Sequence, residues 1–115
     1  MMTYIPDGWV VVKLSGTDPH YKIFGSWRGN WFTEPDRWKF NSGIVKCSYG
    51  PWNEMSEAYK FDGYSGSIYY CNKSSYGNLG LYNQSMLNNF IVKSDNLMEV
   101  LNDRDDWTTM DWIIK

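Results

Sequence analysis

A chain of 115 residues with 43% hydrophobic content has the size and apolar content of one globular domain, so we expect a single domain over residues 1–115 and exclude global disorder. Apolar runs are far shorter than the about 20 residues of a membrane helix, and residues 1–12 lack the features of a signal peptide, so we expect a cytoplasmic protein without a membrane partner. The net charge is −2, and six acidic residues lie between 95 and 111 against Arg104 alone, which disfavours non-specific nucleic-acid binding.

The amino-acid composition predicts the fold class. Ala58 is the single alanine, whereas the chain holds seven Trp, nine Tyr, five Phe and ten Gly. Alanine is the strongest helix former, while aromatic side chains favour strands and glycine favours tight turns. We therefore predict a mainly β protein, built as a small antiparallel sheet or a half-open barrel.

The first half of the chain alternates short strand patterns with turn residues. Both alternating faces of the first pattern carry apolar side chains, which is typical of a central strand. A turn at residues 16–19 then leads into a second strand, and the two are expected to form a hairpin. The strands predicted in this half lie at residues 9–15, 20–27, 37–40 and 44–49, with a bulge or a turn at 41–43.

The middle of the chain gives one ambiguous segment and one clear strand. Residues 56–62 fit either a short strand or one helical turn, and the pattern does not distinguish the two. Residues 67–73 alternate as a strand and follow turn residues at 63–66, so they are predicted to belong to the core of the sheet.

The later part of the chain is predicted to contain the one helix. Residues 72–89 are rich in Asn, Ser and Gly, which indicates a loop, and residues 90–92 indicate a short strand. A short helix is predicted near residues 94–102, because Ser94 or Asp95 can cap its first turn and apolar side chains repeat at helical spacing after them.

Large apolar side chains end the chain after an acidic, turn-prone segment. A free tail would expose these groups to water at a substantial cost, so we expect the segment to dock on the sheet or on another subunit. A homo-oligomer formed through Trp107, Trp112 and Ile113 is therefore one alternative for the oligomeric state. The apolar residues of this segment are Trp107, Met110, Trp112, Ile113 and Ile114.

The chain offers little catalytic or metal-binding chemistry. Cys47 and Cys71 lack zinc-type spacing and lie in strand patterns, so we predict that both are buried, free thiols. His20 is the single histidine, and it stands alone beside a turn. Because nucleophile activation and imidazole metal sites need more than one lone histidine, we predict no catalytic residue, no metal and no cofactor.

Residues 27–39 form the most suggestive segment, because cationic and aromatic side chains interleave there. Aromatic faces and guanidinium groups stack bases, hold phosphates and anchor protein loops, so the segment favours a partner protein or a small nucleotide-like ligand. The alternative is that several of these rings belong to the core. The predicted ligand- or partner-binding residues are Trp27, Arg28, Trp31, Arg37, Trp38 and Lys39, with Phe32 beside Trp31.

Three stretches resemble small uncharacterised proteins encoded by tailed bacteriophages: residues 37–44 (RWKFNSGI), 63–69 (GYSGSIY) and 76–77 (YG). The resemblance covers about the middle half of the chain and carries no catalytic motif or established activity. It implies expression in the cytoplasm of an infected bacterial host. Small phage proteins of this kind often bind host or defence components, and the resemblance implies such a partner here.

These observations favour a non-enzymatic binding domain of phage origin that engages a host or defence protein or a small nucleotide-like ligand. One alternative is a small carboxylate-based hydrolase or nuclease, because acidic groups can perform acid–base catalysis when burial raises the pKa of one of them. A deep pocket with two close carboxylates would favour it. Another alternative is a phage structural or assembly protein, which a large defined oligomer would favour.

Overall fold

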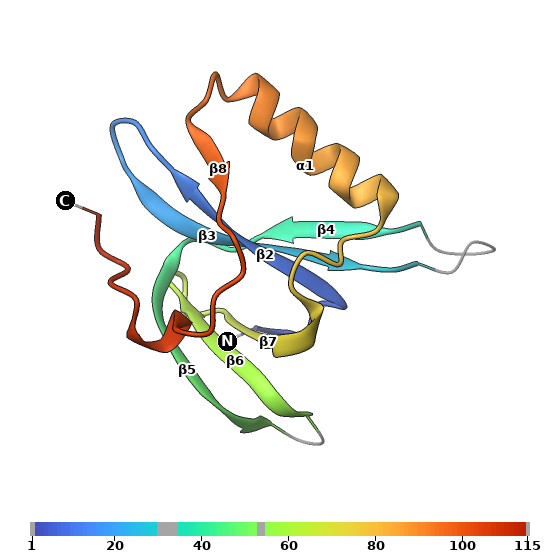
Figure 1. Cartoon of the computed structure of the whole chain (residues 1–115), viewed down its shortest axis with the longest axis vertical. Helices are drawn as coiled ribbons and strands as arrows, with labels where there is room; N and C mark the ends of the chain where they lie inside the picture. Colours follow the sequence, from blue (N-terminus) through green and yellow to red (C-terminus); the bar gives the residue numbers. More distant parts are fainter. Residues whose placement is uncertain (1, 30–34, 53–54, 115) are drawn as a thin grey trace.

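The computed structural model describes residues 2–29, 35–52 and 55–114, and within them the chain forms two four-stranded sheets and one α-helix (Figure 1). The first sheet has the strand order β1–β7–β6–β5, and its strands are β1 (Thr3–Tyr4), β5 (Ile44–Trp52), β6 (Met55–Gly63) and β7 (Ile68–Asn72). The second sheet has the order β4–β3–β2–β8, and its strands are β2 (Gly8–Leu14), β3 (His20–Trp27), β4 (Arg37–Phe40) and β8 (Met98–Val100). The predicted mainly β class is confirmed, and the two sheets do not close into a barrel.

Antiparallel hairpins build most of both sheets. β2 and β3 pair from Gly8 opposite Ser26 to Leu14 opposite His20, which confirms the predicted hairpin. β5, β6 and β7 follow one another as antiparallel neighbours, and the ambiguous residues 56–62 lie inside β6, so they form a strand. The short strand β1 differs, because it pairs in parallel with β7.

Strand β2 lies at the centre of the molecule and has one face in each of two cores. Trp9 and Val11 face the space between the sheets, whereas Val10 and Val12 face the α-helix, as expected for a central strand. The inter-sheet core consists of Trp9, Val11, Ile23, Ile44, Cys47, Tyr59, Phe61, Tyr69, Cys71, Trp107 and Trp112. The helix-side core consists of Val10, Val12, Phe24, Leu79 and Leu87.

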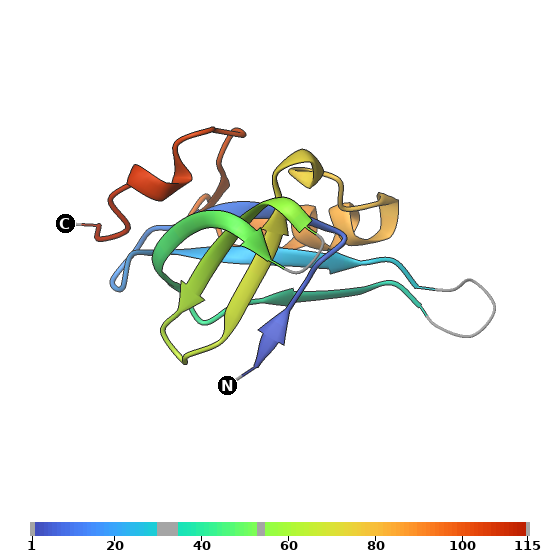
Figure 2. The same ribbon diagram turned by 90° about the horizontal axis from the view of Figure 1, so that it is seen from below.

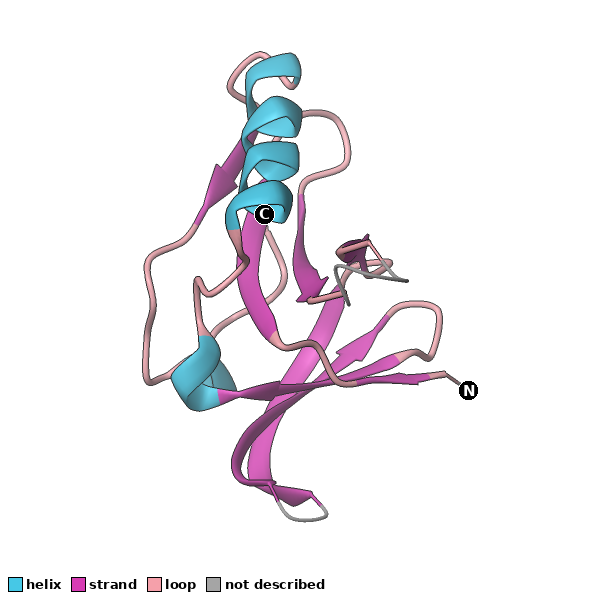
Figure 3. Ribbon diagram, turned by 90° about the vertical axis from the view of Figure 1, so that its right-hand side faces the viewer, coloured by secondary structure: helices cyan, strands magenta, loops and turns pink. Residues whose placement is uncertain are grey.

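Helix α1 (Leu81–Lys93) covers the face of the second sheet that points away from the first sheet (Figure 3). Leu87 fills the helix-side core, and Asn83 is the other fully buried residue of the helix. The Asn83 side-chain nitrogen donates to the Ser26 hydroxyl (2.7 Å) and to the Arg37 carbonyl (2.9 Å). The helix is thereby fixed over β3 and β4 by one apolar and one polar contact.

The predicted position of the helix is wrong. Residues 94–102, predicted to be helical, contain a turn and strand β8, whose three residues pair with β2. The helix instead occupies Leu81–Lys93, including residues 90–92, which were expected to form a strand. The apolar residues at 98 and 100 therefore alternate on a strand and pack into the helix-side core.

Ser94 is a capping residue, but it caps the end of the helix and not a beginning. Its hydroxyl donates to the Ile91 carbonyl (2.6 Å) and accepts from the Met98 N–H (3.1 Å). Asp95 and Asn96 follow with φ values of 56° and 69°. Left-handed residues of this kind end a helix, because the next turn of helix cannot form through them. The polar residues that suggested a helix start thus terminate α1.

The C-terminal strap, residues 101–114, docks on the molecule as predicted. The Leu101 N–H donates to the Val11 carbonyl (2.9 Å), and the Tyr76 hydroxyl donates to the Leu101 carbonyl (2.6 Å). Trp107, in the short 3₁₀ helix Trp107–Thr109, is fully buried, and Trp112 is 6% exposed. The strap therefore supplies two large rings to the inter-sheet core.

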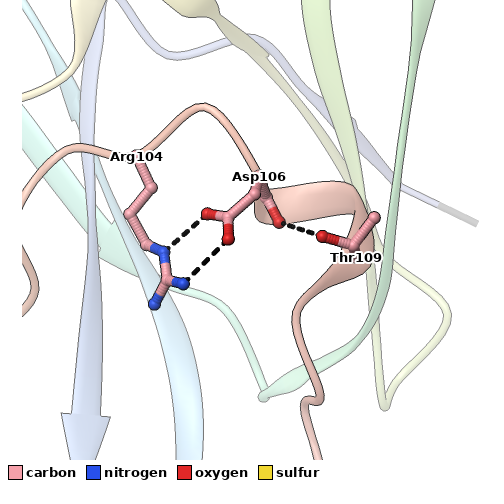
Figure 4. A network of polar contacts seen from close by, with 3 residues as sticks. All are labelled: Arg104, Asp106 and Thr109. Atoms are coloured by element: carbon pink, nitrogen blue, oxygen red, sulfur yellow. Dashed lines mark hydrogen bonds and ion pairs between the residues drawn. The ribbon is translucent and has the colours of Figure 1, made fainter.

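A short polar network holds the turn that carries Trp107 (Figure 4). The Arg104 guanidinium donates to both carboxylate oxygens of Asp106, at 2.7 and 2.9 Å, and this contact lowers the pKa of Asp106. The Asp106 carbonyl accepts from the Thr109 hydroxyl (3.1 Å), while the Arg104 guanidinium lies 5.8 Å from the centre of the Trp107 ring. The acidic segment before Trp107 is therefore ordered by a bidentate contact and a 3₁₀ turn.

Candidate functional site

A hollow of about 230 Å³ lies where the edge strand β4 of the second sheet approaches the edge strand β1 of the first. Figure 2 shows β1 (dark blue) and β4 (teal) on the same side of the molecule. The hollow brings together four of the six predicted binding residues and adds one from β1. Its lining residues are Tyr4, Trp27, Arg37, Trp38 and Lys39.

The pairing of β3 with β4 places cations beside an aromatic ring. Trp27 lies directly opposite Arg37, and Gly25 lies directly opposite Lys39. Side chains alternate across a strand, so these residues share the face of the sheet that points toward β1. Arg37 and Lys39 of β4 therefore lie on one face of the sheet, and Trp38 and Phe40 lie on the other.

Trp27 forms a fixed wall of the hollow. Its indole N–H donates to the Ile5 carbonyl (3.0 Å), and its ring lies 6.2 Å from the ring of Tyr4, edge to face. The ring also lies over Gly25, because a Cβ built at Gly25 would be 3.1 Å from the ring carbon Cη2. A hydrogen bond and close packing therefore hold Trp27 in one orientation.

Tyr4 is surrounded by three neighbours. Its ring centre lies 4.9 Å from that of Tyr69 and 5.4 Å from the Lys39 ammonium, in addition to the contact with Trp27. The ammonium is attracted to the ring quadrupole, a contact worth about 0.5–1 kcal/mol at an exposed site. A base stacking on Tyr4 would have to compete with Lys39, so the ring is not an open stacking platform.

Arg37 and Lys39 are exposed cations on strand β4. Among the described residues, no carboxylate lies within 4.0 Å of either side-chain cation. Asp36, the nearest acid along the chain, accepts a hydrogen bond from the Gly29 N–H (2.8 Å). The face of β4 that lines the hollow therefore carries two positive charges available to an anionic group.

Two predicted residues lie outside the hollow or outside the described residues, and a third, Trp38, only borders the hollow. Arg28 donates through its main-chain N–H to Asp7 (2.8 Å) and through its guanidinium to Asn78 (2.8 Å), so its role in the structure is to join two loops, and it does not line the hollow. Trp38 borders the hollow, but its ring packs on Phe24 (5.8 Å) and Phe90 (5.0 Å) beside the helix-side core. Trp31 and Phe32 lie outside the described residues.

Tyr4 lines the hollow but is not indicated by the sequence pattern. It lies on the two-residue strand β1, which is too short to produce an alternating pattern. Its place beside Lys39 depends on the parallel pairing of β1 with β7, a contact between residues more than sixty positions apart. The strand pattern of a single segment carries no signal of such a pairing.

Acidic residues are sparse among the described residues that line three hollows. Those residues include no acid at the hollow beside β4, Glu99 at a second hollow and Asp105 at a third. No group of three or more His, Cys, Asp or Glu residues suited to a metal ion occurs in the described part of the chain. None of these three hollows therefore brings two described carboxylates together, which is the arrangement that would favour a hydrolase or nuclease.

Cys47 and Cys71 are free and buried, as predicted. Burial raises the pKa of the Cys47 thiol to about 12, and burial also raises the pKa of Cys71 well above its ordinary value. Both sulfurs are therefore neutral thiols at neutral pH, which is the unreactive form.

Two of the three tail residues predicted to join subunits pack within the chain. Trp107 and Trp112 are buried in the inter-sheet core, while Ile113 is 72% exposed. An oligomer built on the two Trp rings would require them to leave that core, so Ile113 alone is available for such a contact. Homo-oligomerisation itself stays a prediction, which the mass of the protein in solution would test.

Comparison of the chain with models of protein families, with curated proteins and with solved structures finds no match. Among the helices of the described residues, none has the length and apolar character needed to cross a membrane.

Proposed function

We propose that this chain is a non-enzymatic binding domain that engages a partner protein through its β4 surface, defined as Tyr4, Trp27, Arg37 and Lys39. The observation that carries the proposal is the pair of exposed cations on β4, which have no carboxylate partner among the described residues and lie beside a fixed aromatic wall. Arg and Trp are the side chains enriched where a few contacts dominate protein association.

The dimensions of the hollow favour a protein partner over an enclosed small molecule. Its volume of about 230 Å³ lies below the roughly 300–1,000 Å³ of typical ligand pockets. The rings of Tyr4 and Trp27 are held by intramolecular contacts, and one of these is the contact of Tyr4 with Lys39. The exposed Arg37 guanidinium and Lys39 ammonium have no carboxylate partner among the described residues, so they are the groups available for recognition. A nucleotide would need both an accessible ring face and room for its sugar, whereas an acidic protein surface needs only the cations and a rigid border.

The resemblance to small phage proteins gives the proposed partner a context. A phage protein made in a bacterial cytoplasm meets host and defence proteins there, and those are the partners we propose. Many bacterial proteins carry acidic surface patches, and exposed cations speed association with such patches by electrostatic steering.

Affinity capture from a bacterial lysate tests the proposal. The wild-type chain is compared with Arg37→Glu/Lys39→Glu and with the control Lys73→Glu/Lys93→Glu, which makes the same change of net charge at exposed lysines outside the β4 surface. We expect one specific protein to be retained by the wild type and the control but lost from the β4 variant. Equal recovery by all three chains, or no specific recovery at all, would contradict the proposal.

A further inference from the structure

Strand β4 is the outermost strand of the second sheet, and its outer edge is open among the described residues. The Asn41 N–H donates to the Ile23 carbonyl (3.0 Å), and the Ile23 N–H donates to the Asn41 side-chain oxygen (2.8 Å), so the main-chain N–H of Asn41 points toward β3. Hydrogen-bonded and non-bonded pairs alternate along an antiparallel ladder, so Arg37 and Lys39 also direct their main-chain groups toward β3. Trp38 and Phe40 consequently direct their N–H and C=O groups to the open edge.

We infer that the partner contributes an extended acidic segment, which adds to β4 as a further antiparallel strand of the second sheet. This inference rests on the function proposed above and specifies the chemistry of the partner. The four outward main-chain groups of Trp38 and Phe40 supply the hydrogen bonds of the added strand. Arg37 and Lys39 supply the selectivity, because acidic side chains of the partner lie opposite them on the same face.

The alternation along β4 determines how close the charges come. Arg37 and Lys39 each form a non-hydrogen-bonded pair with the residue opposite on the added strand. Such pairs have the shorter separation, about 4.5 Å between Cα atoms. Carboxylates two residues apart on the partner therefore lie directly against both cations. Opposite charges at directly opposed positions stabilise a strand pair, and like charges destabilise it.

The other face of β4 defines the residues between those carboxylates. Trp38 and Phe40 are half-buried there, and both rings contact Phe90 of α1, at 5.0 and 5.7 Å. A strand added beside them would place its alternate side chains next to this aromatic shelf. The partner segment should therefore alternate acidic with apolar residues.

The same charges argue against a second copy of this chain as the occupant. Antiparallel pairing of two β4 edges would bring Arg37 and Lys39 of one copy against the same cations of the other. Charged side chains, lysine above all, are a usual protection of edge strands against self-association. Charge repulsion therefore disfavours pairing of the β4 edge with a second copy of this chain, whereas charge attraction favours pairing with an acidic segment.

Calorimetric titration of the full chain with synthetic peptides tests the inference. The probe is the alternating peptide Val-Glu-Val-Glu-Val-Glu, and the matched control is Val-Lys-Val-Lys-Val-Lys. We expect the wild-type chain to bind the acidic peptide about tenfold or more tightly than the basic one, and Arg37→Glu/Lys39→Glu to reverse that order. The reversal requires a folded variant, so it separates recognition from damage to the fold. Equal affinity for both peptides would overturn the inference.

A second arm tests strand addition itself. Methylation of the valine nitrogens removes the main-chain donors of the acidic peptide while keeping its charge, and we expect about tenfold weaker binding. Unchanged affinity would show that the peptide binds through its charge without forming a strand, and it would overturn the inference. Binding of ATP but not of the acidic peptide would also overturn the inference. If the acidic peptide fails while the β4 variant still loses its lysate partner, the strand is wrong and the proposed function stands. Retention of that partner by the variant contradicts the proposed function instead.

Discussion

The two cores of the molecule use different side chains and are completed by different parts of the chain. Trp and Tyr rings fill much of the inter-sheet core, and two of those rings arrive from the C-terminal strap. The helix-side core is smaller and mainly aliphatic, and Leu79 and Leu87 complete it from the segment of α1. Stability of the inter-sheet core therefore depends on the last residues of the chain, whereas the helix-side core does not.

Buried polar atoms distinguish the two cores further. In the inter-sheet core, the Tyr69 hydroxyl and the indole N–H groups of Trp107 and Trp112 have no hydrogen-bond partner among the described residues. Beside the helix-side core, the Asn83 side-chain nitrogen has two acceptors, although its oxygen has no partner within the described part of the chain. An unpaired buried group costs about 1–3 kcal/mol. In the inter-sheet core, the free energy gained by burying large rings therefore exceeds the cost of their unpaired polar atoms. At the helix-side core, the hydrogen bonds of Asn83 position the helix.

The largest expected effect comes from emptying the ring-filled core. Trp107→Ala should lower the free energy of unfolding by about 3–5 kcal/mol, because the cavity left by a fully buried indole cannot collapse completely. Chemical denaturation measures the change. Ile113→Ala is the control from the same strap, and its exposed side chain should leave stability within about 0.5 kcal/mol of the wild type.

Deletion of residues 107–115 extends the same test to the whole strap. We expect loss of soluble folded protein, since both Trp rings leave the inter-sheet core together. Far-UV circular dichroism and the thermal midpoint of the truncated chain provide the measurement. A truncated chain that melts at the wild-type temperature would show that the segment serves interaction and not the fold.

A smaller effect is expected where one polar group anchors the helix. Asn83→Ala removes the donors to Ser26 and to Arg37 and should lower the free energy of unfolding by about 1–3 kcal/mol. Asn88→Ala, an exposed position on the same helix bonded only to Gln84, is the control and should change stability by at most about 0.5 kcal/mol. Equal changes in the free energy of unfolding for the two variants would show that the hydrogen bonds of Asn83 do not anchor the helix on the helix-side core.

The smallest expected effect is a loss of stability at alkaline pH, which arises in the inter-sheet core. Burial raises the pKa of Cys71 above the ordinary 9.0, so above that pH the unfolded chain loses a proton that the folded chain keeps. The free energy of unfolding therefore falls as pH rises, by roughly 1 kcal/mol for this thiol between about pH 8 and pH 9.5. Urea unfolding at both pH values measures the slope. Cys71→Ala should reduce this decrease in the free energy of unfolding with pH. An unchanged decrease would show that other groups cause the pH dependence.

The sequence predicts the strands well because each is a local pattern with a physical period. Residues 9–15 and 20–27 alternate cleanly, and the turn between them is rich in Gly, Asp and Pro, so the β2–β3 hairpin follows from neighbouring residues. The helix was misplaced for an equally physical reason. α1 begins after Gly80 without a side-chain cap and buries only Asn83 and Leu87, so neither its start nor its apolar stripe is visible in the sequence.

The candidate site was predictable in part. Alternation in 37–40 separates Arg37 and Lys39 from Trp38, and the structure follows that rule. The surroundings of two of the other predicted residues depend on distant contacts. Trp38 packs beside the helix-side core because α1 brings Phe90 against it, and Arg28 bonds to Asp7 and Asn78. Positions so far apart along the chain leave no periodic trace, so spacing alone did not reveal them.

The pairing of β2 also determines when the second sheet can be completed during folding. This strand binds partners from a distant part of the chain: Val12 pairs with Val100, and the Val11 carbonyl accepts from the Leu101 N–H. Contacts between distant residues close large loops and slow folding. The second sheet is therefore complete only when residues 98–101 have joined β2, and until then that edge of β2 is exposed to pairing with another unfolded chain.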